Sequence, residues 1–285
     1  MYEAYYQLSG KPFQLSPDPR FFFSSKGHRR AMAYLMYGAH QGEGFIVITG
    51  EIGAGKTMLA RALARDMASR NLILGQVVST SLEADDVVRT VAASLGLSQE
   101  KSKSELLSRI EQYLLACHRQ GKRVLLVVDE VQNLPVKSLE ELRMLSNFVY
   151  ADKPLLQTFL LGQPEFRKTL QSHEMEQLRQ RVIASCHLGP LDQVETEAYI
   201  THRLQTVDWR GDPSFSRDAF AGIRQHTGGI PRKINMLCDR LLLMGRLEEK
   251  HAFTGQDVSE VISELQQEFA FADELPLHED KGRVA

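Results

Sequence analysis

Residues 50–57 read Gly50-Glu51-Ile52-Gly53-Ala54-Gly55-Lys56-Thr57, which is the pattern G-x-x-x-x-G-K-T. The stretch follows the apolar run 45–48 and precedes the helical pattern 58–64. Such glycines let successive backbone N–H groups face one anion, and the N-terminus of the next helix adds its positive end. Strand, glycine loop and helix in this order form a phosphate site. The chain is therefore predicted to bind a nucleoside triphosphate.

The residues of this loop have distinct expected tasks. Lys56 is placed to reach the β- and γ-phosphates, and the Thr57 hydroxyl is placed to bind Mg²⁺. A glycine turn that happens to precede a lysine is the alternative, and the flanking strand and helix count against it. The residues expected to line the phosphates are Gly50, Glu51, Ile52, Gly53, Ala54, Gly55, Lys56, Thr57 and Met58.

The composition is that of an ordinary soluble protein of 285 residues, 43% hydrophobic and 25% charged. A formal net charge of -2 provides no global basic field to attract nucleic acid or anionic lipid. No apolar run approaches the length of a membrane span, and the first residues lack the design of a signal peptide. Three isolated cysteines (Cys117, Cys186 and Cys238) indicate reduced thiols in a cytoplasmic protein.

Strand and helix patterns alternate between residues 45 and 189. Strands are predicted at 45–49, 73–80, 122–129, 156–162 and 184–188. Helices are predicted at 56–70, 83–95, 104–119, 137–149 and 165–182. Repeated alternation of this kind implies an α/β fold, in which helices sandwich a mostly parallel sheet. The sequence thus predicts a five-stranded αβα nucleotide-binding domain over residues 45–189.

The segments on either side differ in character from this domain. Residues 1–44 are irregular and aromatic and are expected to form an N-terminal linker, with its basic cluster (Lys26, His28, Arg29 and Arg30) on a solvated helix face. Beyond Gly189-Pro190 only helical patterns remain, at 194–206, 216–226, 231–248 and 255–268. They predict a small all-helical domain over 190–268. The polar residues 269–285 are predicted to form a disordered tail.

The second chemical motif is the apolar run 124–128 followed by Asp129 and Glu130. A strand ending in two carboxylates places them at the carboxyl edge of the sheet, where folds of this kind bind ligands. Asp129 is expected to hold Mg²⁺, directly or through water, and Glu130 to orient and deprotonate the attacking water. Strands commonly end in solvated charges, so the motif gains its meaning from the phosphate loop about 70 residues earlier.

Phosphoryl transfer also needs groups that sense the γ-phosphate and neutralise its charge. Gln163 follows the strand 156–162, and its amide could position the water, or it is simply a polar residue before Pro164. Arg179 and Arg181 precede the last strand, where either could reach a neighbouring subunit's nucleotide, or be a solvated arginine at a helix end.

Two further features are open between a functional and a structural role. Arg232 follows Pro231 at the first turn of a helix, and proline there fixes the direction of the helix. A helix start with Pro-Arg alone would mean little, but its place in a helical domain that follows a nucleotide-binding domain favours a contact from Arg232 to the γ-phosphate. The pair Gln132-Asn133 either relays the state of the ligand or belongs to a capped turn before Pro135.

Together these residues resemble an AAA+ ATPase, over the chain from about residue 2 to about residue 268. Within that group the chain is most similar to the secretion-type ATPases of the ExeA/GspA group. It is especially similar to those that accompany exosortase (PEP-CTERM) and exopolysaccharide loci. The stretches that carry the resemblance are 1–3 through 12–13, 16–22, 42–57, 129–134, 161–165 and 229–232.

The resemblance implies an AAA+ αβα sandwich followed by a helical lid, and hydrolysis of ATP with Mg²⁺. It implies that Gln163 is sensor one and Arg232 is sensor two. It further implies an arginine finger at Arg181 or Arg179, with Arg181 favoured because it belongs to the recurring Gln-Arg-Val/Ile triplet. A finger that acts in trans implies a nucleotide-dependent homo-oligomer, for which a hexamer is one form.

The implied role is energising or regulating protein sorting, secretion or exopolysaccharide export at the inner membrane. ExeA-type proteins usually continue into a membrane span and a peptidoglycan-binding region, and this sequence has neither, so a cytoplasmic or peripheral location is expected. One alternative is a DNA-binding regulatory ATPase of the transposition-helper or initiator type, against which the acidic tail and net charge of -2 argue. Another is a scaffold that binds ATP but hardly hydrolyses it.

Overall fold

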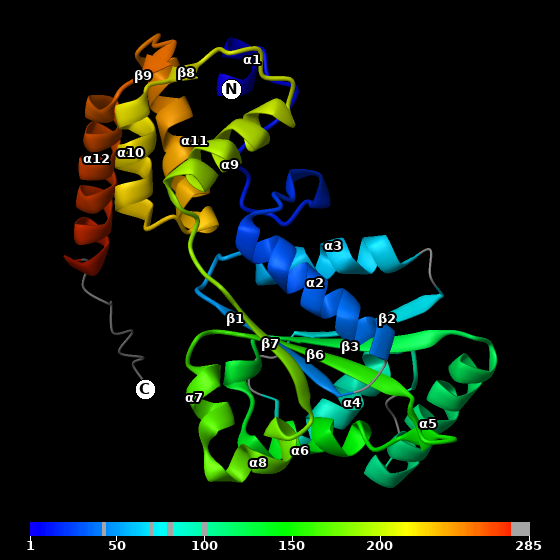
Figure 1. The fold of residues 1–285 in the computed structure, drawn as a ribbon. Coiled ribbons are helices and arrows are strands. Elements are labelled where there is room, and N and C mark those ends of the chain that lie inside the picture. The colour runs from blue at the N-terminus through cyan, green and yellow to red at the C-terminus, as the bar shows by residue number, and fades with distance from the viewer. Residues whose placement is uncertain (42–43, 69–70, 79–81, 99–101, 275–285) are drawn as a thin grey trace, which may run out of the picture. The chain divides into compact units, whose positions relative to one another are not determined.

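The structure is a computed structural model, of which we describe residues 1–41, 44–68, 71–78, 82–98 and 102–274. The chain forms two compact units (Figure 1). One unit runs from Pro17 to Pro190. The other combines Met1–Ser16 with the chain from Leu191 onward. We call the first the α/β unit and the second the helical unit.

A five-stranded parallel sheet organises the α/β unit, in the order β2-β3-β6-β1-β7. Its strands are β1 (Phe45–Gly50), β2 (Leu72–Val78), β3 (Arg123–Asp129), β6 (Leu156–Gly162) and β7 (Val182–Leu188). All neighbours in this sheet pair in parallel. Central strands covered on both faces need apolar side chains throughout, and β1 is buried at all six positions. The predicted mostly parallel five-stranded sheet is confirmed.

Helices cover both faces of this sheet, so that it separates two hydrophobic cores (Figure 1). Helices α2 (Lys26–Gln41) and α3 (Lys56–Ala68) pack on one face. The other face carries α4 (Ala84–Ser94), α5 (Lys103–Arg119), α6 (Val136–Leu145), α7 (Phe166–Gln171) and α8 (Glu176–Arg179). Successive side chains of a strand point to opposite faces. Accordingly Phe45 and Val47 enter one core, and Ile46 and Ile48 enter the other.

The helical unit consists of α9 (Gln193–Gln205), α10 (Arg217–Thr227), α11 (Pro231–Leu247) and α12 (Gly255–Glu274). The short helix α1 (Tyr2–Tyr5) packs against α11, and the Tyr2 hydroxyl donates to Asp239. The buried Arg203 holds the next part of the N-terminal segment, because it donates to the carbonyls of Pro12 (2.5 Å) and Gln14 (3.1 Å). Residues far apart in sequence therefore build one unit.

Two predicted helices of the α/β unit differ in the structure. The helix predicted over 137–149 ends at Leu145, and a hairpin of β4 (Val149–Tyr150) and β5 (Lys153–Pro154) follows. The hairpin turns on Ala151 and Asp152, both with positive φ and neither a glycine, so the usual turn signal is missing. The helix predicted over 165–182 is interrupted at Ser172, whose backbone is extended, and β7 already begins at Val182.

The outer segments also need correction. Residues 1–44 are not one linker, because the first 16 pack in the helical unit and the rest in the α/β unit. The helical unit is not wholly helical, since β8 (Ser214–Phe215) and β9 (Ala252–Phe253) form a short parallel pair. Residues 269–274, predicted to be disordered, belong to α12, and the remainder of the predicted tail, 275–285, lies outside the described residues. Among the described helices, none combines the length and the apolar character that a membrane crossing requires.

Candidate active site

The loop between β1 and α3 has the backbone of a phosphate-binding turn. Gly53 and Gly55 adopt φ of 83° and 96°, a left-handed region that residues with a side chain rarely occupy. Gly50 approaches β7 so closely that a Cβ atom there would lie 2.9 Å from the carbonyl oxygen of Leu188. The glycines of the motif are therefore needed for the path of the loop itself.

Lys56 is buried at the start of α3 and its side chain folds back over the loop. Its Nζ donates to the carbonyl oxygens of Gly50 (2.8 Å) and Glu51 (3.1 Å). Burial lowers the pKa of Lys56, while the carboxylates of Glu130 and Asp129 act in the opposite direction. The ammonium group is thus fixed at the concave side of the loop, close to the acidic residues of the second motif.

The two residues expected to bind Mg²⁺ are in direct contact. The Thr57 hydroxyl donates to Asp129 Oδ2 at 2.6 Å, and Asp129 Oδ1 accepts the backbone N–H of Glu130 at 2.9 Å. One carboxylate and one hydroxyl fit Mg²⁺ well, because this ion takes few protein oxygens and completes its shell with water and phosphate. No cluster of three or more His, Cys, Asp or Glu side chains able to hold a metal occurs in the part of the chain described above.

Glu130 and Gln163 meet at the ends of neighbouring strands. Glu130 has a left-handed backbone (φ 53°) directly after β3 and precedes the 3₁₀ turn η2 (Val131–Asn133). Because β3 pairs with β6, the residue that follows β6 lies beside it, and Gln163 Nε2 donates to Glu130 Oε2 at 3.3 Å. The structure therefore brings together the carboxylate and the amide that the sequence placed at separate strand ends.

The two arginines before β7 differ in exposure. Arg179 is exposed at the end of α8 and donates to the carbonyl oxygen of Leu170 at 3.1 Å. Arg181 is half-buried and donates to Ser146 Oγ at 2.8 Å. The guanidinium of Arg181 is thus held at the end of α6, whereas Arg179 is exposed.

Arg232 belongs to the helical unit, where it is exposed in the first turn of α11. Gly228 and Gly229 precede it with φ of 61° and 72°. A Cβ atom on Gly229 would lie 2.2 Å from the carbonyl oxygen of Leu191, so only glycine fits there. The rigid entry to α11 that the sequence predicts is present, with Pro231 as the first helical residue.

His28 lies against the phosphate loop, contrary to the expectation that its basic cluster is solvated. The side chain is buried, its Nδ1 is 2.7 Å from Ser25 Oγ, and its Nε2 lies 2.8 Å from the position of a Cβ atom on Gly55. A sequence signal exists: His28, Ala31 and Leu35 share the spacing i, i+3, i+7, and the other two are core residues. His28 therefore joins the residues around the loop.

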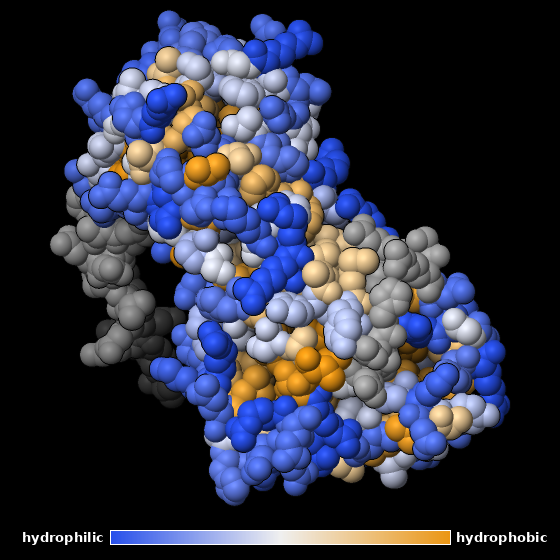
Figure 2. Space-filling model, viewed as in Figure 1, coloured by the Kyte–Doolittle hydropathy of each residue, from blue (hydrophilic) through white to orange (hydrophobic). Residues whose placement is uncertain are grey.

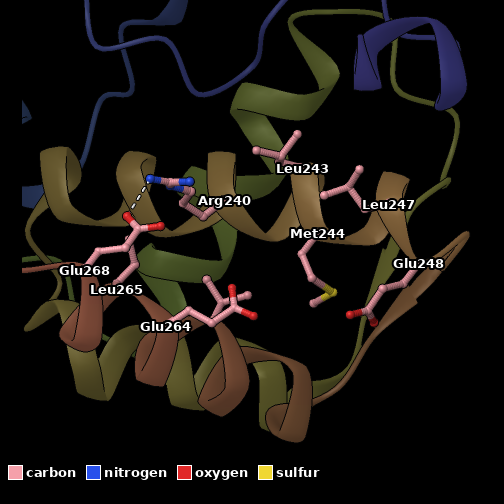
Figure 3. A pocket seen from close by; sticks show the side chains of 9 residues that line it. Arg240, Leu243, Met244, Leu247, Glu248, Glu264, Leu265 and Glu268 are labelled. Atoms are coloured by element: carbon pink, nitrogen blue, oxygen red, sulfur yellow. Dashed lines mark hydrogen bonds and ion pairs between the residues drawn. The ribbon is translucent and has the colours of Figure 1, made fainter.

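The described residues also contain a groove on the helical unit, between α11 and α12 (Figure 3). Arg240 and Glu268 form an ion pair of 2.8 Å at one end of it, and Leu243, Met244 and Leu247 lie along α11. Its volume of about 150 Å³ is smaller than the roughly 300 Å³ at which small-molecule pockets begin.

The parallel five-stranded sheet, with a glycine loop between β1 and α3, has the AAA-type P-loop fold. Residues 39–170 match the family model described as "AAA domain". General secretion pathway protein A of Aeromonas hydrophila is 36% identical over 261 residues, which cover 91% of this chain and 47% of that protein. The Mu-like prophage FluMu DNA transposition protein B of Haemophilus influenzae is 27% identical over 156 residues, 53% of this chain and 50% of that protein.

A solved structure supports the same fold. The crystal structure of Cdc6p from Pyrobaculum aerophilum superimposes with a TM-score of 0.69, over 94% of this chain and 74% of that one, at 17% identity. The predicted AAA+ αβα fold is confirmed. The chain spans about half the length of the curated relatives that it matches.

Proposed function

We propose that this protein binds ATP with Mg²⁺ and hydrolyses it. The observation that carries the proposal is the convergence of four side chains at one edge of the sheet. Lys56 and Thr57 come from the start of α3, and Asp129 and Glu130 from the end of β3; Thr57 and Asp129 are in hydrogen-bond contact. The cation, the hydroxyl and the two carboxylates have different tasks in hydrolysis.

The loop N–H groups and Lys56 hold the β- and γ-phosphates, and Lys56 offsets their negative charge. Asp129 and Thr57 hold Mg²⁺, which when bound neutralises charge on the phosphate oxygens. Glu130 accepts a proton from the attacking water, and the amide of Gln163 orients that water or the γ-phosphate. These roles require Glu130 and Gln163 to be neighbours, and the 3.3 Å hydrogen bond between them supports that requirement.

We further propose that a second copy of the chain completes the site. Arg181, or Arg179 beside it, would reach the neighbouring nucleotide, and Arg232 would link the helical unit to the γ-phosphate as sensor two. Support comes from the edge strand β7, which follows both arginines: Ile183 is 36% exposed, and Figure 2 shows apolar groups gathered around this strand. Exposed apolar patches on a soluble protein commonly mark contact surfaces.

The first test is Glu130→Gln, which keeps the shape of the side chain but removes the proton acceptor. Loss of a general base typically costs about 10²- to 10⁴-fold in rate. We expect the variant to bind ATP as the unmodified chain does and to release phosphate at least about 100-fold more slowly. If the variant and the unmodified chain release phosphate at the same low steady-state rate, the result would favour a scaffold that binds ATP but hardly hydrolyses it.

The cellular role proposed here is energising or regulating envelope protein sorting, secretion or exopolysaccharide export, from the cytoplasm or at the inner-membrane surface. The similarity to a relative named general secretion pathway protein A supports a secretion role, and exosortase-type or polysaccharide export components are the proposed partners. A deletion strain should lose export of such cargo. A plasmid with the unmodified chain should restore export, and one with Glu130→Gln should not; export unaffected by the deletion would exclude this role.

A second candidate is a DNA-binding regulatory ATPase, which the similarity to a DNA transposition protein favours. Phosphate contacts give DNA affinity a steep dependence on salt. Duplex DNA should therefore bind tightly at low salt, and more weakly as salt rises, if this candidate is right. Absence of binding at low salt, with and without ATP, would eliminate it.

A further inference from the structure

One side-chain amide connects the two strand ends of the site. Gln132 lies half-buried in the turn η2, and its Nε2 donates to Glu130 Oε2 at 2.6 Å. Its Oε1 accepts the backbone N–H of Gln163 at 2.9 Å. The amide of Gln132 thus spans from the carboxylate that follows β3 to the residue that follows β6.

The orientation of this amide follows from its partners. A backbone N–H can only donate, so the Gln132 atom facing Gln163 must be the oxygen. The NH₂ group then faces Glu130, where the partner is a carboxylate oxygen. A flipped amide would place a donor against a donor and an acceptor against a carboxylate, so the arrangement has one stable orientation.

The backbone makes room for this bridge. A Cβ atom on Gly162 would lie 2.7 Å from Val131 Cγ1 and 3.3 Å from Gln132 Oε1. Glycine at the end of β6 therefore allows the turn η2 to approach the strand closely. The turn and the strand end also contact each other elsewhere, so the position of Gln132 is fixed by packing as well as by its own hydrogen bonds.

We propose that Gln132 is a positioning residue that holds the Glu130 carboxylate in place, so that the amide of Gln163 can turn toward the γ-phosphate without releasing the base. The inference rests on the ATP hydrolysis proposed above. Gln132 makes the shorter of the two amide contacts to Glu130, 2.6 Å against 3.3 Å for Gln163.

Gln132→Glu tests this role. The variant keeps the acceptor for the Gln163 N–H but turns a carboxylate oxygen toward Glu130 Oε2. Two carboxylates at hydrogen-bond distance repel each other, which should displace the Glu130 side chain from its position. We expect this variant to lose at least about 10-fold in kcat, with the Kd for ATP changed less than about twofold. Gln132→Ala, which removes the bridge, should lower kcat about 10- to 100-fold with the Kd for ATP changed less than about twofold.

Asn133→Asp is the matched control, because it adds the same charge one residue further along the turn. Asn133 is exposed, and its Oδ1 is 3.5 Å from Gln132 Nε2. Its kcat and its Kd for ATP should match those of the unmodified chain. An unchanged kcat in Gln132→Glu would overturn the inference, and so would ATP affinity lost in parallel with kcat in Gln132→Ala. An unmodified chain that binds ATP without turning it over would instead overturn the proposed function.

Discussion

The side chain of Lys56 illustrates how the loop prepares for a highly charged ligand. An ammonium group taken out of water loses hydration, and this loss lowers the pKa of Lys56. Two backbone carbonyl oxygens replace part of that hydration, those of Gly50 and Glu51. The carboxylates of Asp129 and Glu130 add an attraction that keeps the charge favourable. Phosphate oxygens would supply a further, stronger partner for the same cation.

Removal of this cation should weaken ATP binding. We expect Lys56→Ala to raise the Kd for ATP about 10- to 100-fold, as the loss of a charge-assisted hydrogen bond predicts. Arg61→Ala is a suitable control, since Arg61 lies on the same helix and donates to the carbonyl of Pro17. Titration of a fluorescent ATP analogue would measure both variants. Equal affinity in Lys56→Ala and the unmodified chain would contradict the assignment.

Helix α12 shows how one element of the helical unit is fixed at its start. Asp257 accepts hydrogen bonds from the backbone and hydroxyl of Thr254, both at 2.7 Å, and from Lys250 at 2.6 Å. Burial alone would raise the pKa of Asp257, but the hydrogen bonds from Lys250 and Thr254 outweigh it and lower the pKa. The cap therefore depends on an ionised carboxylate at a buried position.

This cap should make stability depend on pH. Because the folded pKa of Asp257 lies below its ordinary 3.8, its contribution is complete above that value and is lost as the pH falls through the folded value. Asp257→Asn should lower the free energy of unfolding by about 1 kcal/mol at pH 7, with the difference shrinking as the pH falls below 3.8. Glu260→Gln on the exposed side of α12 is the control. Urea unfolding of each chain at pH 7 and at a pH below 3.8 would measure these free energies. A difference between Asp257→Asn and the unmodified chain that does not change with pH would contradict the prediction.

At the scale of the whole molecule, we propose that two subunits share the site. The two candidate finger residues, Arg179 and Arg181, lie just before β7, which is an edge strand of the sheet. A neighbouring subunit could therefore approach the sheet at this edge. Arg181 would have to exchange its hydrogen bond with Ser146 for the neighbour's phosphate. Arg179 is already exposed.

An arginine finger typically contributes about 10³–10⁵ in rate. We expect Arg181→Ala to lower ATP turnover at least about 10³-fold and Arg179→Ala to have a smaller effect. Ser146→Ala, which frees Arg181 without removing it, should retain turnover. If the finger acts in trans, the specific activity of the unmodified chain should rise with protein concentration, which phosphate release would measure. Full turnover by Arg181→Ala, independent of concentration, would exclude it as a finger in trans.

Local patterns made much of this molecule predictable, and long-range packing accounts for the rest. The loop 50–57 and the pair Asp129-Glu130 carry their geometry in a few adjacent residues, so the sheet edge could be assembled from sequence. The hydrogen bond between Arg203 and Pro12 joins residues 191 positions apart, and no local sequence pattern predicts it. The burial of His28 likewise depends on how α2 packs against a loop about 25 residues later.

The helical unit is built from both ends of the chain, and this has a consequence for synthesis. Residues 1–16 leave the ribosome before residues 17–190, and the helices they pack against follow after about 175 residues, roughly 10–35 s later at ordinary elongation rates. Leu8 and Phe13, both buried in the finished protein, stay without those helices for that time. The α/β unit can fold in the interval. In a nascent chain stalled once residues 17–190 have emerged from the ribosome, these residues should therefore resist protease while the first 16 residues are still cleaved.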